Sequence, residues 1–336
     1  MVSPKSAASI AANTAKNLLK AAERQSKRGN IAIKSPESVQ LQLTDYSFYY
    51  DTAAPSANQL QHSANVFKAS KHSPVHMWTA SEFRTIPMSD LPEVAFLGRS
   101  NVGKSSLLNA IMEKQICFTS SKIGRTRTLN AYGIGGRKGG EARVVLVDTP
   151  GYGKGSHEEW GEEIIKYLTK RKQLRRTFIL LDSHHGIKPA DAAILSLLRS
   201  SAIPHQVILS KADSVLIKGG QKRGARGLRP QRIEDLRLLA KKIRTKVQPA
   251  RDVGQGGTEL GIPALGEILA CSSRIKNVGG VDFLGVDAIR WAILRAAGLG
   301  VEGEGGGGAG GGGPGVGVGV GVRPEMEENA RSVLDG

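Results

Sequence analysis

The sequence predicts an α/β fold in which a mostly parallel sheet carries helices on both faces. Short apolar segments that suit buried strands alternate with longer helical segments through the middle of the 336-residue chain, and this alternation favours a doubly wound sheet. The expected strands are residues 93–97, 129–134, 143–147, 177–182, 205–210 and 267–271. The expected helices are residues 104–113, 158–174, 189–200, 230–246 and 282–297. Sheets of this kind bind ligands at the carboxyl ends of their strands.

The loop after the first expected strand carries a phosphate-binding pattern. Residues 98–105 read Gly-Arg-Ser-Asn-Val-Gly-Lys-Ser, with glycine, lysine and serine at P-loop spacing. Glycines let backbone N–H groups face phosphate oxygens, and the helix that begins here adds the positive end of its dipole. We expect Lys104 to reach the β- and γ-phosphates and Ser105 to bind Mg²⁺. The predicted phosphate-binding residues are Gly98, Arg99, Ser100, Asn101, Val102, Gly103, Lys104, Ser105 and Ser106.

A second motif follows the apolar segment 143–147. It consists of Asp148, Thr149, Pro150 and Gly151. An aspartate at the end of a buried strand is placed to hold the Mg²⁺ shell, and the backbone N–H of Gly151 can meet the γ-phosphate. Its place after the P-loop distinguishes this motif from an ordinary Asp-x-Pro-Gly turn. We therefore assign all four residues to the nucleotide site.

Two later segments match loops that read a nucleotide base. Residues 210–213 read Ser-Lys-Ala-Asp, and residues 271–273 read Cys-Ser-Ser. The carboxylate of Asp213 can accept hydrogen bonds from guanine N1–H and the 2-amino group, whereas adenine would leave it unpaired at a cost. The predicted guanine-binding residues are Ser210, Lys211, Ala212, Asp213, Cys271, Ser272 and Ser273. The order of the motifs along the chain therefore predicts GTP as the ligand.

The segment between the first two motifs is a candidate switch. Residues 123–128 read Ile-Gly-Arg-Thr-Arg-Thr, and such a switch needs a threonine that completes Mg²⁺ coordination when the γ-phosphate is present. We choose Thr126, with Thr128 as the alternative, and add Gly124 and Arg125 to the nucleotide site. The predicted catalytic residues are Lys104, Thr126 and Gly151, and the predicted metal ligands are Ser105, Thr126 and Asp148.

Taken together, these motifs resemble the EngB/YihA/YsxC-type GTPases of the TrmE–Era class. The matching segments are Gly98-Arg-Ser-Asn-Val-Gly-Lys-Ser-Ser-Leu-Leu-Asn109, Gly124-Arg-Thr126, Val147-Asp-Thr-Pro-Gly-Tyr-Gly153, Leu181-Asp-Ser-His-His-Gly186 and Ser210-Lys-Ala-Asp213. The resemblance covers residues 90–297 and implies one Ras-like P-loop GTPase domain. It further implies GTP and GDP as ligands, Mg²⁺ as cofactor and a role in assembling the large ribosomal subunit.

Net charge points to a polyanionic partner. The chain carries a formal charge of +17, and residues 91–300 alone hold 35 Lys and Arg against 18 Asp and Glu. GTP binding needs no such surplus, so ribosomal RNA of the large subunit or its precursor is the expected partner. Two stretches could form the contact, Lys166–Arg176 and Lys218–Arg232. For the first stretch the alternative is a helix whose basic end simply suits its dipole.

The two ends of the chain differ from the middle. Residues 1–36 hold seven Lys and Arg and one acid, Glu23, a composition typical of a mitochondrial transit peptide. We therefore expect a location in the mitochondrial matrix; a basic tail without targeting function, in a cytoplasmic protein, is the alternative. Residues 37–89 are expected to form a weakly ordered extension, and residues 298–336 a glycine-rich, disordered tail. No apolar run approaches the length of a membrane span, so we expect no membrane partner. We further expect a monomer.

The sequence also bears on the rate of hydrolysis. Tyr152 stands where a Ras-like protein has the glutamine that orients the attacking water. We therefore expect slow intrinsic hydrolysis, with the site completed by a ribosomal group. The resemblance implies K⁺ as the alternative, because Asn101 occupies the position that binds K⁺ in relatives that depend on a monovalent cation. The alternative function is a GTP-gated RNA- or ribosome-binding protein with negligible hydrolysis.

Overall fold

The computed structural model describes residues 41–117, 128–136, 141–153, 158–217, 230–248, 261–275 and 282–300. All of these residues belong to one unit, Val39–Gly336. The predicted transit peptide, the tail from residue 301 onward and most of the candidate switch lie outside the described residues.

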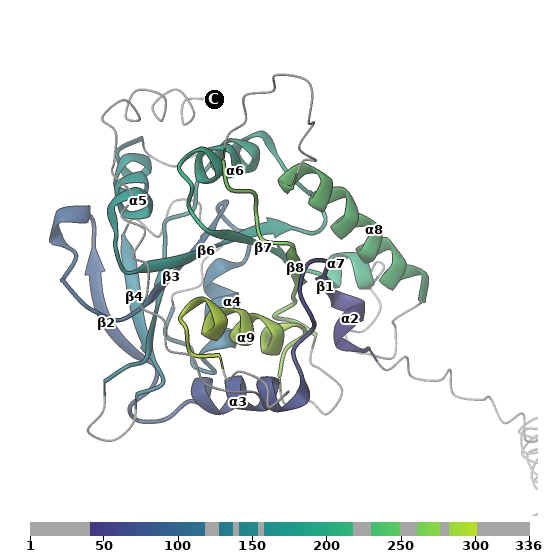
Figure 1. The fold of residues 1–336 in the computed structure, drawn as a ribbon, viewed down its shortest axis with the longest axis horizontal. Helices are drawn as coiled ribbons and strands as arrows, with labels where there is room; N and C mark the ends of the chain where they lie inside the picture. Colours follow the sequence, from purple (N-terminus) through teal and green to yellow (C-terminus); the bar gives the residue numbers. More distant parts are fainter. Residues whose placement is uncertain are drawn as a thin grey trace, which may run out of the picture. The chain divides into compact units, whose positions relative to one another are not determined.

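One eight-stranded sheet organises the described residues, with the strand order β1-β8-β7-β6-β3-β5-β4-β2 (Figure 1). The strands are β1 (Ser47–Tyr49), β2 (Val75–Ala80), β3 (Glu93–Gly98), β4 (Leu129–Ile134), β5 (Val144–Asp148), β6 (Leu174–Asp182), β7 (His205–Ser210) and β8 (Glu267–Ala270). The five central strands pair in parallel. The outer pairs β1–β8, β4–β5 and β2–β4 are antiparallel. The carboxyl ends of the parallel strands therefore meet at one edge.

Helices cover both faces of this sheet. They are α2 (Leu43–Tyr46), α3 (Ala57–Phe67), α4 (Lys104–Ile111), α5 (Glu158–Lys170), α6 (Pro189–Ser200), α7 (Asp213–Leu216), α8 (Pro230–Val247) and α9 (Val286–Ala296), with a 3₁₀ turn η1 (Phe83–Thr85). Figure 1 shows α3, α4 and α9 on one side of the central strands and α5, α6 and α8 on the other. None of the helices in the described part of the chain is both long and apolar enough to cross a bilayer.

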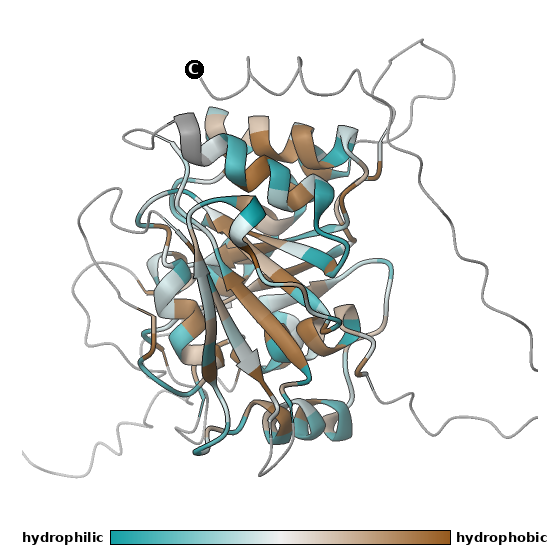
Figure 2. Ribbon diagram, turned by 90° about the vertical axis from the view of Figure 1, so that its left-hand side faces the viewer, coloured by the Kyte–Doolittle hydropathy of each residue, from teal (hydrophilic) through white to brown (hydrophobic). Residues whose placement is uncertain are grey.

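The core is split into two layers by the sheet. Along β3, Val94 and Phe96 pack with α4 and α9, whereas Ala95 and Leu97 pack with α5 and α6. Because both faces are covered, the central strands are apolar without alternation, and Figure 2 shows them as a hydrophobic centre. This confirms the predicted fold class, and all six predicted strands form, with bounds that differ by at most a few residues.

Two predicted helix bounds need correction. The helix expected from residue 282 begins at Val286, because Gly285 has a φ of 76° and ends the preceding turn. The helix expected to reach residue 174 ends at Lys170. There Arg171 turns inward, and Leu174 already begins β6.

The expected weak order of residues 37–89 is wrong for residues 41–89. Strand β1 pairs with β8 and buries Phe48, while β2 pairs with β4 and buries Trp78. Helix α3 packs on α9 and buries Phe67 completely. Each of these segments is short and contributes few apolar side chains, so its stability comes from its partner and its own sequence carries little periodicity.

Gly285 provides a test of the chain path that joins β8 to α9. A Cβ added there would overlap the carbonyl oxygen of Ala270, in addition to straining a φ of +76°. We expect Gly285→Ala to lower the free energy of unfolding by more than about 2 kcal/mol, measured by urea denaturation. Gly186→Ala is the matched control, because Gly186 also has a positive φ but nothing lies within 4 Å of the added Cβ. It should cost about 1 kcal/mol; equal losses in both variants would contradict the role of the Ala270 contact.

Candidate functional site

The P-loop joins β3 to α4 at the carboxyl edge of the sheet. Its turn depends on two residues in the left-handed region, Asn101 with φ 63° and Gly103 with φ 108°, a conformation that asparagine and glycine adopt most readily. Gly98 is required for a different reason, since a Cβ there would lie 2.7 Å from Val102 Cγ1. The loop therefore ends with Lys104 as the first residue of α4, which is where a helix attracts anions.

Three polar side chains meet beneath this loop. Burial lowers the pKa of Lys104, although the negative charge of Asp148 opposes the shift. Burial raises the pKa of Asp148, opposed by the charge of Lys104 and by a hydrogen bond from Ser105. The Ser105 hydroxyl donates to Asp148 Oδ2 at 3.4 Å. Asp148 Oδ1 is buried and has no hydrogen-bond partner among the described residues.

This arrangement suits a hard cation. A buried carboxylate with an unpaired oxygen, next to a hydroxyl, offers the oxygen donors that Mg²⁺ prefers. The predicted ligands Ser105 and Asp148 thus lie together. The third predicted ligand, Thr126, lies outside the described residues with Gly124 and Arg125. The alternative, Thr128, is described, and its backbone oxygen and hydroxyl accept hydrogen bonds from Asn130 Nδ2.

The loop after β5 lies directly against the P-loop. A Cβ on Gly151 would lie 2.9 Å from backbone atoms of Ser100, and the Ser100 N–H donates to the Tyr152 carbonyl at 3.2 Å. The Thr149 hydroxyl instead donates to the Phe96 carbonyl at 2.8 Å. Thr149, predicted to bind nucleotide, therefore directs its side chain into the sheet, and Gly151 is the residue of this motif whose backbone adjoins the P-loop.

The predicted base-reading loops are also joined to each other. The Ser272 hydroxyl donates to Asp213 Oδ1 at 2.8 Å and accepts the N–H groups of Arg274 and Ile275. The Ser210 hydroxyl donates to the Val102 carbonyl at 2.8 Å, which ties the base site to the P-loop. The bond from Ser272 holds the Asp213 carboxylate in place.

Cys271 and Ala212 support this site through backbone hydrogen bonds, and neither presents a side-chain group to it. The Ala212 N–H donates to the Cys271 carbonyl, and the Cys271 N–H donates to the Leu209 carbonyl. Both residues are buried. Burial raises the pKa of the Cys271 thiol to about 12, so the thiol stays protonated and unreactive.

Asp182 belongs to the site but was given no role by the sequence. Its Oδ2 accepts Lys211 Nζ at 2.8 Å, and its Oδ1 accepts the His184 N–H at 2.9 Å. Burial alone would raise the pKa of Asp182, but these hydrogen bonds lower it overall. Asp182 thereby holds the side chain of Lys211, a residue of the predicted base-reading loop. Its position at the end of β6, next to the strand that carries Ser210, was the signal available in the sequence.

The basic stretch Lys166–Arg176 does not form one exposed surface. Arg171 is buried, with Nη2 at 2.6 Å from Glu93 Oε1, and Arg176 Nη1 donates to Gln206 Oε1 at 2.9 Å. Both cations are used inside the fold because the chain turns here from α5 into β6. The exposed cations that remain are Lys170, Lys172 and Arg175. In the second stretch, residues 218–229 lie outside the described residues.

Comparison with known proteins places this chain among GTP-binding proteins. A family model described as 50S ribosome-binding GTPase matches residues 93–211. The EngB GTP-binding protein of Mesorhizobium japonicum is 41% identical over 143 residues, which cover 40% of this chain and 68% of the relative. The EngB protein of Bartonella quintana is 43% identical over 137 residues, which cover 38% of this chain and 64% of that relative. A solved structure of Aquifex aeolicus Era bound to GDP and AlF₄⁻ is 22% identical to this chain, with a TM-score of 0.42. The match covers 64% of this chain and 58% of the Era chain.

Asp213→Asn tests the predicted base recognition. We expect the GTP affinity to fall about 100-fold, because the amide cannot accept both guanine donors. Xanthosine triphosphate, which carries a carbonyl in place of the 2-amino group, should bind relatively better. Titration with fluorescent nucleotides measures both. Asp235→Asn is the control, since Asp235 pairs with Arg232 on the surface of α8. Unchanged discrimination between the two bases in Asp213→Asn would refute the assignment.

Proposed function

Since this chain belongs to the EngB family of GTP-binding proteins, we propose that it is a Mg²⁺-dependent GTPase switch in the assembly of the large mitochondrial ribosomal subunit. One observation carries the proposal: hydrogen bonds connect the four loops. The P-loop and the start of α4 bond to the loops that begin at Asp148 and Ser210, and the loop that begins at Cys271 bonds to Asp213. A phosphate site and a guanine site joined in this way are what a GTP-dependent switch requires.

The phosphate end of the site has residues for each task. A bound Mg²⁺ would offset the negative charge that develops on the phosphate oxygens in the transition state. Ser105 and Asp148 would hold it, joined by Thr126 when the γ-phosphate is present. Lys104 is buried, and an adjacent phosphate would favour its charged form. The Gly151 N–H would donate to the γ-phosphate, so that hydrolysis removes its acceptor.

The side chain after Gly151 supports the proposal of slow intrinsic hydrolysis. Tyr152 is buried, and its hydroxyl donates to Asp191 Oδ1 at 2.9 Å. It cannot orient a water molecule at the γ-phosphate while it makes this contact. We therefore propose that the site is completed from outside the chain, by a ribosomal group or by a monovalent cation. If turnover stays negligible with ribosomal particles present, GTP acts only as a conformational ligand.

Potassium dependence tests the second of these sources. Asn101 is an exposed residue of the P-loop, and we propose that its side chain helps to hold K⁺. Replacing Na⁺ with K⁺ at constant ionic strength should raise the turnover number about tenfold, measured by phosphate release. Asn101→Ala should remove this stimulation, whereas Asn65→Ala, at an exposed site on α3, should keep it. Equal rates in both salts would exclude the cation.

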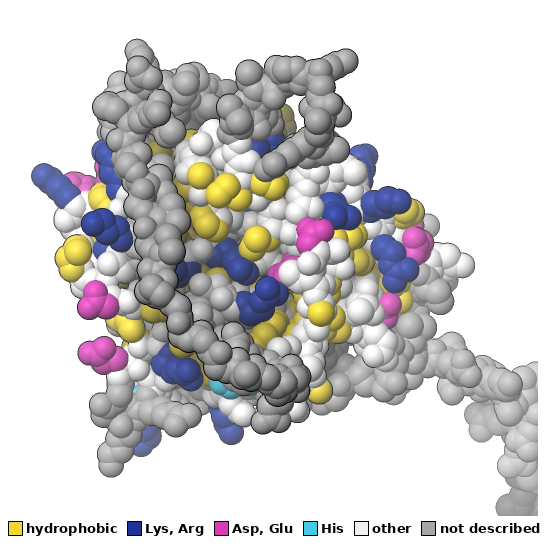
Figure 3. Space-filling view, viewed as in Figure 1, with side chains coloured by type: hydrophobic (Ala, Val, Ile, Leu, Met, Phe, Trp, Pro, Cys, Tyr) yellow, Lys and Arg dark blue, Asp and Glu magenta, His cyan; other side chains and the backbone are white. Residues whose placement is uncertain are grey.

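The described surface supports contact with RNA. Lys170, Lys172 and Arg175 are exposed where α5 leads into β6. The outer side of α8, which begins where the second basic stretch ends, exposes Lys241, Lys242 and Lys246. Figure 3 shows Lys and Arg side chains over the region where Figure 1 draws α8. Cations spread in this way suit a phosphate backbone and give salt-dependent binding.

Sedimentation with ribosomal particles tests the proposed partner. We expect the chain to migrate with the large mitochondrial subunit or its precursor with a GTP analogue, and much less with GDP or without nucleotide. Binding should weaken by about tenfold or more between low and moderate salt. Particles from the cytoplasm should not bind, and binding to them alone would contradict the mitochondrial location.

A matched pair of variants locates the contact. Replacing Lys170, Lys172 and Arg175 with glutamine should weaken binding and reduce its salt dependence. Replacing the exposed residues Lys68, Lys71 and Arg84 removes the same charge elsewhere and should have little effect. Equal losses in the two triple variants would indicate a general charge effect and no defined contact at α5.

A further inference from the structure

A buried carboxylate outside the nucleotide motifs connects two of them. Asp191 lies in the first turn of α6 and is completely buried. Its Oδ1 accepts the Tyr152 hydroxyl at 2.9 Å, and Arg99 Nε lies 3.2 Å from Oδ1 and 3.0 Å from Oδ2. The Lys188 N–H donates to Oδ2 at 2.9 Å. A buried carboxylate is stable only with such partners, so the side chains of Tyr152 and Arg99 are bound to it.

The partners of Asp191 lie beside the residues predicted to meet the γ-phosphate. Arg99 follows Gly98 in the P-loop, and Tyr152 follows Gly151. Their backbones form a parallel bridge, and the Ser100 N–H donates to the Tyr152 carbonyl. Gly151 is therefore enclosed by the P-loop on one side and by an anchored tyrosine on the other.

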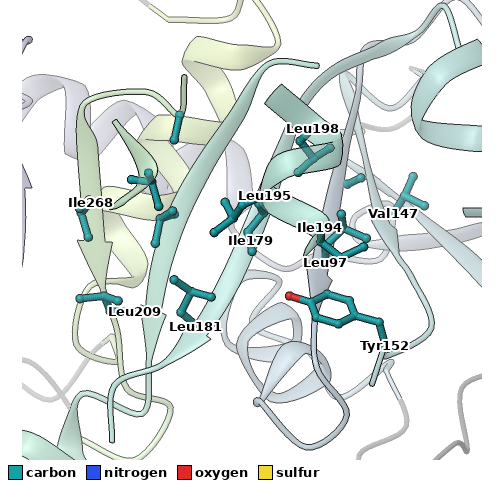
Figure 4. Packing of buried hydrophobic residues seen from close by; sticks show 14 of the residues in the cluster. Leu97, Val147, Tyr152, Ile179, Leu181, Ile194, Leu195, Leu198, Leu209 and Ile268 are labelled. Carbon is teal, nitrogen blue, oxygen red and sulfur yellow. The ribbon is translucent and has the colours of Figure 1, made fainter. Parts of the chain in front are cut away.

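The tyrosine ring is itself part of the core. Figure 4 shows Tyr152 beside Leu97 and Ile194, with its hydroxyl directed inward. Burial and the negative charge of Asp191 raise the pKa of Tyr152, so the hydroxyl stays protonated and can donate. Loss of the hydroxyl alone would leave the ring packed beside Leu97 and Ile194 but would remove the hydrogen bond between residue 152 and Asp191.

We infer that Asp191 is a positioning residue for GTP hydrolysis. Through Tyr152 and Arg99 it holds the Gly151 N–H at the place where the γ-phosphate arrives. This inference rests on the proposed contact between Gly151 and that phosphate. Hydrogen bonds to a developing charge depend steeply on position, so a small displacement of this N–H lowers the rate and the preference for GTP over GDP.

The chain contains a matched control for this inference. The Tyr167 hydroxyl donates to Glu93 Oε2 at 2.8 Å, and Glu93 also binds Arg171. The tyrosine and the carboxylate of this second group are buried, as Tyr152 and Asp191 are. It lies at the amino end of β3, whereas the P-loop begins at the carboxyl end. Tyr152→Phe and Tyr167→Phe therefore remove the same chemical bond at opposite ends of one strand.

The experiment compares the two variants in the full chain with Mg²⁺. Tyr152→Phe should lower the turnover number about tenfold and the affinity for a non-hydrolysable GTP analogue about five- to tenfold. Its GDP affinity should stay within about twofold. Tyr167→Phe should leave all three values within about twofold. It should lower the melting temperature about as much as Tyr152→Phe does. Asp191→Asn, which keeps the side-chain shape, should reproduce the nucleotide effects of Tyr152→Phe.

Each other outcome overturns the inference. If Tyr152→Phe keeps its preference for the GTP analogue, Asp191 has only a structural role, and the proposed contact of Gly151 is unaffected. If Tyr167→Phe loses the preference equally, the effect is one of stability. If the unmodified chain binds GTP analogue and GDP equally, the γ-phosphate contact itself is absent, and the proposed function fails with the inference.

Discussion

The parallel pairing of β3 with β5 and β6 is the constraint on which the rest of the structure depends. Its register sets Phe96 opposite Asp148 and opposite Phe178, so the three strands end at one edge. The loops after those strands then lie within hydrogen-bond reach of each other. Strand β7 extends the same edge, because Asp182 pairs with Ser210. The contacts between the P-loop and the loop after β5 are formed between segments that this pairing brings together.

Buried polar bonds then determine how the loops sit at that edge. The apolar layers fix where the strands and helices lie, but they are not directional. Direction comes from individual bonds, such as Ser210 to the Val102 carbonyl, Ser272 to Asp213 and Tyr152 to Asp191. Each of these groups would be costly to bury alone. The site is therefore held in shape by bonds that a ligand does not need to form.

Sequence reasoning located the fold and the motifs because both are local signals. An apolar strand followed by glycines, lysine and serine carries its own chemistry, so β3 and α4 could be placed to within a few residues. Strand β1 could not be found in this way, since its three residues gain stability only by pairing with β8. Arg171 was assigned to a surface for the same reason, because its partner Glu93 is distant in the sequence. The role of Asp191 was likewise hidden, as its partners come from two other loops.

The order of the strands along the chain has a consequence for synthesis and folding. The two edge strands of the sheet, β1 and β2, come first in the chain, yet the partner of β1 is β8, near the end of the described residues. Contacts between such distant segments form late, because a long loop must close first. A chain that emerges from its amino end therefore carries an unpaired β1, with Phe48 uncovered, until almost the whole domain has been made. The sheet can be completed at this edge only after residues 267–270 have been synthesised and have paired with β1.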